Sequence, residues 1–359
     1  MKYLIAPLIA LVLSVWFALP TMAQAPITYT LTSPGGDFIF TTIRSSSNWL
    51  LIADSTGSPV FERSSAGSFG DLKVQQGKLV YYSGTTDQWE VLNEDYQLID
   101  TWQTVGYPID AHDIQLLDNG GALLMVYREF PYDLSPWGGL VTATVVSCII
   151  QEINPDKSLA WQWDGWDHNP LTDTNRSLTT ARVDYDHCNA VEQDDDGNVL
   201  YSSRHLDQIT KIDRQTGAVI WKLGGKSNQF TFTNDAGFAL QHDIRRIGNG
   251  HITLFDNGQP ARGYSRAVEY EIDETGKVIT RTWEYRGPFA FCCGNAQRLE
   301  NGNTFINFGP GHPTMREVTP DGVVVFEADT EFSYRSFRLP WRRRWYLPII
   351  WDSSAGSRQ

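Results

Sequence analysis

The sequence predicts an all-β protein and, within that class, a six-bladed β-propeller; a seven-bladed ring is the alternative. Short alternating runs contain most of the 13 Trp, 15 Tyr and 17 Phe residues, and Asn-Gly or Asp-Gly turns separate them. One phrase also recurs: a histidine followed eight residues later by a glycine, as at His112 and Gly120 and again at His242 and Gly250. The phrases begin 43 residues or more apart, which is typical of four-stranded propeller blades.

Residues 1–23 are expected to be a secretory signal peptide. Lys2 precedes an apolar run over residues 3–19, and Thr21 and Ala23 suit the subsites of a signal peptidase. We therefore expect cleavage after Ala23 and a periplasmic or secreted protein, with a membrane anchor as the alternative. No later segment reaches the ~20 apolar residues of a spanning helix.

Residues 24–335 are predicted to form the propeller. The six units run over residues 27–61, 69–102, 112–163, 187–223, 242–285 and 294–328, each with about four short strands. The third unit is the longest, and its excess lies at 128–146 and 165–183. Insertions in repeat proteins fall in loops, often on the binding face.

Residues 336–359 are expected to be a C-terminal tail. Its Trp-Arg-Arg-Arg-Trp-Tyr segment at 341–346 is a basic cluster. Pro340 and Pro348 exclude an amphipathic helix across it, which favours packing on the last blade over a contact with a membrane surface.

Three histidines occupy one register of the repeat: His112, His187 and His242. Because the innermost strands of a propeller line its channel, we predict that these side chains meet at one channel mouth. Asn189 lies two residues beyond His187, so a strand would point both side chains the same way. Arg204 belongs to the next strand of that blade.

Such a ring suits chemistry on a small anion. A neutral imidazole can act as a nucleophile, an acid or a base near pH 7. A guanidinium offers paired donors to sulfate or phosphate oxygens. The net charge of −13 argues against a nucleic-acid partner but not against a small anionic substrate. His205 and Asp207 are interpreted as residues that order their strand.

The four cysteines, Cys148, Cys188, Cys292 and Cys293, permit three pairings that the sequence does not distinguish. One or two structural disulfides are expected in an exported chain. A vicinal bridge between Cys292 and Cys293 is a further option.

The chain resembles the arylsulfotransferase family, the PAPS-independent arylsulfate sulfotransferases and their shorter relatives. The resemblance is carried by Asp-Tyr-Asp-His-Cys-Asn-Ala-Val at 184–191, Gly-Asn-Val-Leu-Tyr-Ser-Ser-Arg-His at 197–205, Gln-His-Asp at 241–243 and Gly-Asn-Ala-Gln-Arg-Leu at 294–299. These phrases and others between them cover most of residues 110–340.

The resemblance implies sulfuryl transfer from an aryl sulfate donor to a phenolic acceptor through a sulfated histidine, with no cofactor. It assigns the nucleophile to His242. It assigns His112, His187, Asn189 and Arg204 to binding the sulfuryl oxygens and handling the phenol proton. The chain departs from the larger members, which carry an N-terminal β-rich domain, and from the usual phrase at Asp186, Cys188 and Ala190.

Three other functions remain open at this stage. The histidines could bind zinc in a hydrolase or lyase, although Asn189 and Arg204 are poor metal ligands. The Asp-Arg-Gln-Thr-Gly phrase at 213–217, followed by Trp221, resembles the tryptophan docking phrase of quinoproteins, but in only one repeat. A propeller that binds a ligand without turnover is the third alternative.

Overall fold

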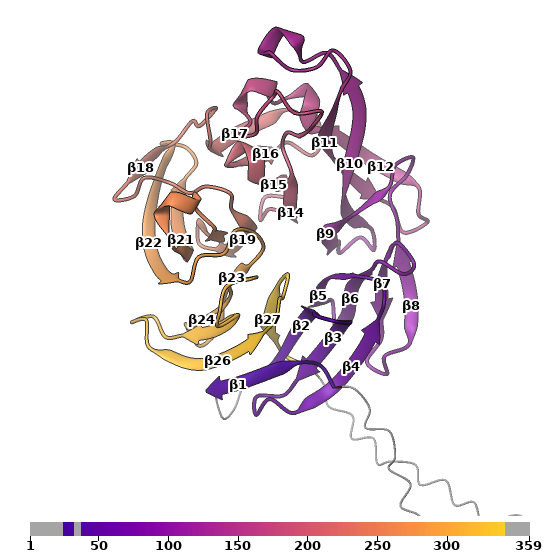
Figure 1. Ribbon diagram of the computed structural model, residues 1–359, viewed down its shortest axis with the longest axis vertical. Coiled ribbons are helices and arrows are strands. Elements are labelled where there is room, and N and C mark those ends of the chain that lie inside the picture. Colours follow the sequence, from indigo (N-terminus) through magenta and orange to yellow (C-terminus); the bar gives the residue numbers. More distant parts are fainter. Residues whose placement is uncertain (1–23, 32–36, 342–359) are drawn as a thin grey trace, which may run out of the picture.

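Six small sheets of four or five strands surround a central axis in the described part of the chain (Figure 1). The structure is a computed structural model, and it describes residues 24–31 and 37–341. The prediction of a six-bladed β-propeller is therefore confirmed, and the seven-bladed alternative is wrong. The predicted signal peptide lies outside the described residues.

The second, third and fourth blades follow the predicted units closely. The second blade contains β5 (Phe69–Gln75), β6 (Lys78–Ser83), β7 (Gln88–Leu92) and β8 (Leu98–Trp102). The third contains β9 (Ile109–Leu116), β10 (Ala122–Tyr132), β11 (Ala143–Ile153) and β12 (Leu159–Asp164), with β13 (Arg182–Asp184) parallel to β11. The fourth contains β14 (Cys188–Gln193), β15 (Val199–Ser203), β16 (Gln208–Ile212) and β17 (Val219–Gly224).

The fifth blade is formed by one continuous stretch, whereas the sixth and first blades each include a strand from the opposite end of the described chain. The fifth blade contains β19 (His242–Gly248), β20 (His251–Asp256), β21 (Ser265–Asp273), β22 (Val278–Gly287) and β18 (Thr231–Thr233). The sixth contains β23 (Asn295–Arg298), β24 (Thr304–Asn307), β25 (Met315–Val318), β26 (Val324–Thr330) and, at its outer edge, β1 (Ile27–Leu31). The first contains β2 (Phe38–Arg44), β3 (Asn48–Ala53), β4 (Pro59–Ser65) and, innermost, β27 (Ser336–Leu339).

The first and last described strands therefore belong to other blades than predicted. β1 was expected in the first blade but pairs with β26 of the sixth. β27 lies within the segment assigned to a tail and pairs with β2 of the first blade. The predicted boundary at residue 335 thus falls between the last residues of the channel mouth and the strand that closes the ring.

Apolar side chains fill the space between neighbouring blades. Between the fourth and fifth blades, Ile209 and Leu223 pack with Leu254 and Val268, and all four are fully buried. Burial of one such side chain contributes about 1.5–3 kcal/mol. These layers hold the innermost strands β5, β9, β14, β19, β23 and β27 around the axis, each in contact with the next.

The third blade contains the extra residues that the sequence predicts, but part of them form strands and not a loop. Residues 128–146 were expected to form a loop, but β10 and β11 pair continuously from Ala122 with Ile153 to Tyr132 with Ala143. This long hairpin extends beyond the ring and bears the short helix η1 (Ser135–Trp137) (Figure 1). The second excess contains η2 (Gly165–Asp167), η3 (Leu171–Asp173) and β13.

Buried charges close the channel beneath its mouth. Arg335 is fully buried and lies 3.3 Å from carboxylate oxygens of both Asp71 and Asp243, and 3.5 Å from Asp113. Lys73 lies 2.9 Å from Asp71, and Arg245 lies 2.7 Å from Asp243 and 2.8 Å from Asp113. Three carboxylates thus meet three cations. Such a network fixes the relative positions of the inner strands because no member can move without leaving a buried charge unpaired.

No helix among the described residues is long and apolar enough to cross a membrane.

Candidate active site

The predicted residues gather at the channel mouth where the innermost strands begin. His112 lies in β9, His242 is the first residue of β19, and His187 directly precedes β14. The ring centroids of His112 and His187 are 5.2 Å apart. Arg204 opens the short helix η4 (Arg204–Leu206), and its backbone N–H donates to the carbonyl of His187 at 3.0 Å.

His112 is oriented by a carboxylate two residues before it. Its Nδ1 lies 2.8 and 2.9 Å from the two carboxylate oxygens of Asp110. Because an ionised carboxylate only accepts hydrogen bonds, Nδ1 carries the proton and Nε2 keeps its lone pair when the ring is neutral. Among the described residues, no hydrogen-bond partner faces that Nε2.

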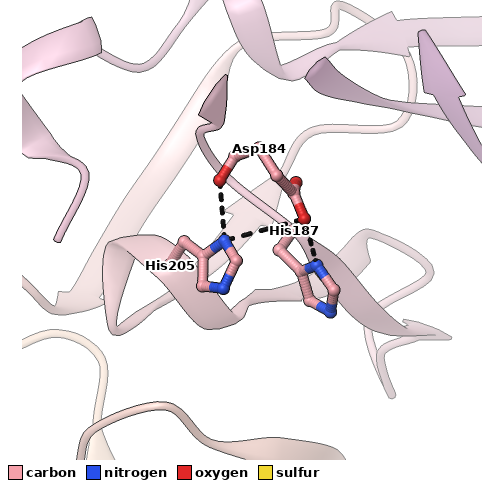
Figure 2. A group of neighbouring side chains, drawn as sticks. All are labelled: Asp184, His187 and His205. Atoms are coloured by element: carbon pink, nitrogen blue, oxygen red, sulfur yellow. Dashed lines mark hydrogen bonds and ion pairs between the residues drawn. The ribbon is translucent and has the colours of Figure 1, made fainter. Parts of the chain in front are cut away.

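His187 is oriented in the same way by Asp184, as Figure 2 shows. Its Nδ1 lies 2.6 Å from Oδ2 of Asp184. Burial lowers the pKa of His187, so the ring is neutral at pH 7. Burial alone would raise the pKa of Asp184, but the hydrogen bond from His187 and the positive charge of Arg182 help to hold it below its ordinary value. The pair thus presents an unprotonated Nε2.

His205 serves the site as a hydrogen-bond relay, a role that sequence reasoning missed. Its Nδ1 donates to the backbone carbonyl of Asp184 at 2.7 Å, and its ring centroid lies 4.6 Å from that of His187 (Figure 2). Burial, together with the neighbouring His187, lowers the pKa of His205 to about 3. The neutral ring therefore offers its Nε2 as an acceptor.

Arg204 is a cation held by neutral groups. Its Nη1 donates to Nε2 of His205 at 2.6 Å, and its Nη2 donates to the carbonyl of Phe291 at 2.7 Å. Its buried Nε has no hydrogen-bond partner among the described residues. No carboxylate of the described chain forms an ion pair with Arg204, whereas Arg128 and Arg182 are each paired with one. An uncompensated guanidinium at a channel mouth favours an anionic ligand.

His242 is neutral and fixed in one tautomer. Asn257 donates through Nδ2 to the carbonyls of Ala290 and Cys293, so its Oδ1 accepts from Nδ1 of His242 at 2.7 Å. Burial, followed by the positive charge of Arg204, holds the pKa of His242 well below its ordinary value. The Nε2 lone pair accepts the backbone N–H of Cys293 at 3.2 Å.

Asn189 is directed toward the residue that precedes His242. It is fully buried, and its Nδ2 donates to the backbone carbonyl of Gln241 at 2.7 Å. The expected two-residue alternation fails because His187 has a left-handed backbone (φ 47°) and the pairing of β14 shifts between Cys188 and Ala190. Asn189 therefore supports the segment that carries His242.

Two tyrosines complete the wall of the mouth, and sequence reasoning missed both. The ring of Tyr127 lies 5.5 Å from that of His112 and 5.4 Å from that of His187. Tyr334 meets His112 edge-on at 5.6 Å, and its buried hydroxyl has no partner among the described residues. Tyr334 stands just before an innermost strand, the same place that the histidines occupy, but in a segment with no histidine to reveal it.

Gly294 occupies the corresponding place in the sixth blade. Its φ is 97°, and a Cβ there would lie 2.5 Å from the ring of Phe255. Only glycine fits this turn, which carries Cys293 over His242.

Two pockets open beside the histidines. One, of about 150 Å³, is lined by His112 and Tyr334 together with Arg44, Phe69 and Tyr82. The other, of about 300 Å³, is more polar and is lined by Asp184 and His205 together with Arg176 and Arg182. A larger hollow of about 310 Å³ lies elsewhere, toward the ends of β5 and β9, and its Lys73 and Arg245 already pair with channel carboxylates.

Asp184, His187 and His205 are close enough to be considered as metal ligands, since their ligand atoms lie within 4.8 Å of one another. Their hydrogen bonds argue against it. Both Nδ1 atoms donate toward Asp184, and Nε2 of His205 accepts from a guanidinium. A metal ion would have to displace these bonds beside the positive charge of Arg204, so the donor set fits an anion site better than a cation site.

Comparisons with known proteins agree with the fold and identify the family model that matches. Residues 76–331 match the model described as arylsulfotransferase (ASST). A protein of unknown function from Bacteroides caccae is similar in structure, with a TM-score of 0.52, 12% identity, and coverage of 84% of this chain and 98% of that one. A functionally unknown protein from Desulfotomaculum acetoxidans gives a TM-score of 0.52 at 9% identity, with 86% and 100% covered. At these identities the likeness shows the fold alone. None of the curated proteins matches the sequence.

Proposed function

Since this chain belongs to the arylsulfotransferase family, we propose that it transfers a sulfuryl group from an aryl sulfate ester to a phenolic acceptor. The observation that carries the proposal is Arg204, a guanidinium without a carboxylate partner beside the neutral imidazoles of His187, His205 and His242. A sulfate ester supplies the negative charge that this arrangement lacks. The side chains of Phe69, Tyr82 and Tyr334 in the adjoining pocket suit the aromatic ring.

In the first half-reaction, Nε2 of His242 gives up the hydrogen bond that it accepts from the N–H of Cys293 and attacks the sulfur atom. The new S–N bond forms as the S–O bond to the aryl group breaks, and the electron pair of that bond leaves on the phenolate oxygen. Arg204 donates to the sulfuryl oxygens, whose charge must be stabilised in the transition state. The neutral tautomer of His242 supports this role, because an imidazolium has no lone pair to attack with.

In the second half-reaction, the oxygen of an acceptor phenol attacks the same sulfur and the S–N bond breaks. The phenol loses its proton to a general base. His187 and His112 suit this task, since each has a carboxylate on Nδ1 and an open Nε2. The proton remains on that imidazole until it passes to solvent or to the next leaving phenolate.

Turnover of 4-nitrophenyl sulfate with and without phenol tests the proposal. We expect phenol-dependent release of 4-nitrophenolate and an equal amount of phenyl sulfate. Trypsin releases His242 in the peptide 227–245, which contains no other histidine. That peptide should gain a sulfuryl group when the donor is present and the acceptor absent, provided that digestion avoids acid. Release of nitrophenolate without phenyl sulfate would indicate a hydrolase, and no release would indicate a binding protein.

We also propose that the mature protein works outside the cytoplasm. The disulfide between Cys148 of β11 and Cys188 of β14 supports this, because structural disulfides are maintained in oxidising compartments. Mass spectrometry of the N-terminus of the exported protein would test the expected cleavage after Ala23.

A further inference from the structure

Cys292 and Cys293 form a turn that lies directly over His242. Their Sγ atoms are 2.8 Å apart. The N–H of the peptide bond between them is the group that donates to Nε2 of His242 at 3.2 Å. The carbonyl of Cys293 accepts from Asn257, the same residue that fixes Nδ1 of His242. Both ring nitrogens of His242 therefore depend on this turn.

We propose that Cys292 and Cys293 are a redox modification site that a small or protein disulfide converts to a vicinal disulfide, and that this oxidation releases Nε2 of His242. The chemical step stands apart from the proposed function. If His242 is the nucleophile of the proposed function, release of its Nε2 also makes it available for sulfuryl transfer, and this consequence rests on that function.

The chemistry balances as an ordinary thiol–disulfide exchange. The Cys292 thiolate attacks the oxidant R–S–S–R, forms a mixed disulfide and releases one thiolate. The Cys293 sulfur, after losing its proton, then attacks Sγ of Cys292 and releases the second thiol. Two protein thiols and one oxidant disulfide thus become one protein disulfide and two R–SH molecules.

The surroundings of the pair favour this order of attack. A hydrogen bond from the Cys293 thiol holds the pKa of Cys292 below its ordinary value, and the positive charges of Arg204 and Arg44 act in the same direction. The same hydrogen bond and burial raise the pKa of Cys293. Cys292 is therefore the more readily ionised of the two thiols, and it is also the more accessible. The neighbouring Phe291 is 61% exposed, so the turn faces solvent and can be reached by an oxidant.

Closing the bridge draws the Sγ atoms from 2.8 Å to bonding distance and strains the peptide that caps His242. Consecutive Cα atoms are about 3.8 Å apart across a trans peptide. Disulfides usually join Cα atoms about 4.4–6.8 Å apart. The bridge would enclose this peptide in an eight-membered ring, and we expect rotation of the peptide to relieve the strain of that ring. Cys293 already has a left-handed backbone (φ 65°), and rotation of the peptide turns its N–H away from Nε2.

The test compares protein equilibrated with glutathione disulfide and protein equilibrated with reduced glutathione, both desalted before analysis. Trypsin releases both cysteines in one peptide, 287–298. After oxidation this peptide should lack two hydrogen atoms and take up no iodoacetamide. In the reduced sample it should take up two equivalents. Cys148 and Cys188 lie in other peptides and should remain joined in both samples.

The second readout is the acylation of His242 by diethyl pyrocarbonate, which requires an unprotonated and accessible ring nitrogen. Modification of peptide 227–245 should be about five-fold faster in the oxidised protein, the effect of losing one hydrogen bond. In Cys292→Ser the rate should match that of the reduced protein under both conditions. Cys293→Ser gives the same comparison if the first variant does not fold.

Two results would overturn the inference: a peptide 287–298 that still takes up two equivalents of iodoacetamide after oxidation, or a disulfide that leaves the acylation rate of His242 unchanged. Neither readout uses an aryl sulfate. A protein that passes both tests but does not turn over 4-nitrophenyl sulfate would keep the redox site and refute the proposed function.

Discussion

Arg204 donates from Nη1 to Nε2 of His205 at 2.6 Å, so its position is set by a neutral imidazole rather than by a carboxylate. The His205 ring is in turn held through Nδ1 by the backbone of Asp184. This chain of hydrogen bonds orients the guanidinium without neutralising it. A carboxylate in the place of His205 would orient Arg204 equally well but would cancel the charge that attracts an anion.

Replacing Arg204 by lysine should slow turnover of 4-nitrophenyl sulfate by about 10²–10³-fold, the usual effect of removing one donor to a developing oxyanion. An ammonium cannot supply the paired donors of a guanidinium. Steady-state kinetics and thermal unfolding would be measured together. Arg316→Lys is the matched control, since Arg316 lies in β25 and pairs with Glu327, away from the site. Near-normal turnover in Arg204→Lys would exclude Arg204 from the reaction.

Replacing His242 by alanine should abolish both sulfuryl transfer and the sulfated peptide 227–245, because no other lone pair occupies its place. His251→Ala is the control. His251 lies in β20, pairs with Glu269 and should leave turnover unchanged. If His242→Ala still transfers sulfuryl groups, the double displacement through this residue is wrong.

Asp184→Asn tests whether the carboxylate positions His187. An amide can present its N–H to Nδ1 and so favour the wrong tautomer, and we expect kcat to fall by about 10²-fold or more with little change in KM. The carboxylate also raises the pKa of His187, so the acidic limb of the pH profile should move to lower pH in the variant. Asp184→Glu should restore part of the rate. An unshifted profile would mean that His187 does not titrate in the reaction.

Stability should fall between pH 6.5 and about 3 because of His205. Burial depresses its pKa to about 3 in the folded protein, so the unfolded chain binds more protons in this window. The free energy of unfolding therefore decreases as the pH falls through it. Urea unfolding of the wild type and of His205→Gln would be compared at pH 7 and pH 4.5. The variant should lose less stability between these two values, and equal losses would contradict the prediction.

Arg335→Met should cost about 3–5 kcal/mol of unfolding free energy, because it leaves the buried carboxylates of Asp71 and Asp243 without their shared cation. Lys157→Met offers a contrast: Lys157 forms an exposed pair with Asp100, worth at most about 1 kcal/mol. Urea unfolding measures both. Similar small losses would show that the channel network contributes little.

The fold could be predicted because the blade repeats its turn and strand pattern, and each repeat signals the same unit. The register of His112, His187 and His242 followed from that repetition. The partners of these histidines did not. Asp110 and Asp184 lie two and three residues before their histidines, and only the backbone geometry of each turn decides that they fold back.

Asn189 shows the opposite limit. The prediction assumed that His187 and Asn189 share one regular strand, but His187 has a left-handed backbone and the pairing of β14 shifts beside it, and neither feature leaves a clear signal in the sequence. β27 was missed because it is four residues long and lies next to a basic cluster. Its place in the ring depends on pairing with β2, almost three hundred residues earlier.

The closing strand has a consequence for when the protein acquires its chemistry. Tyr334 and Arg335 immediately precede β27, one forming the wall beside His112 and the other joining the three channel carboxylates. During synthesis, these residues emerge from the ribosome after all three histidines have been made. The nascent chain therefore lacks Tyr334 beside His112 and Arg335 beneath the mouth until β27 pairs with β2. The site is complete only when the ring of blades has closed.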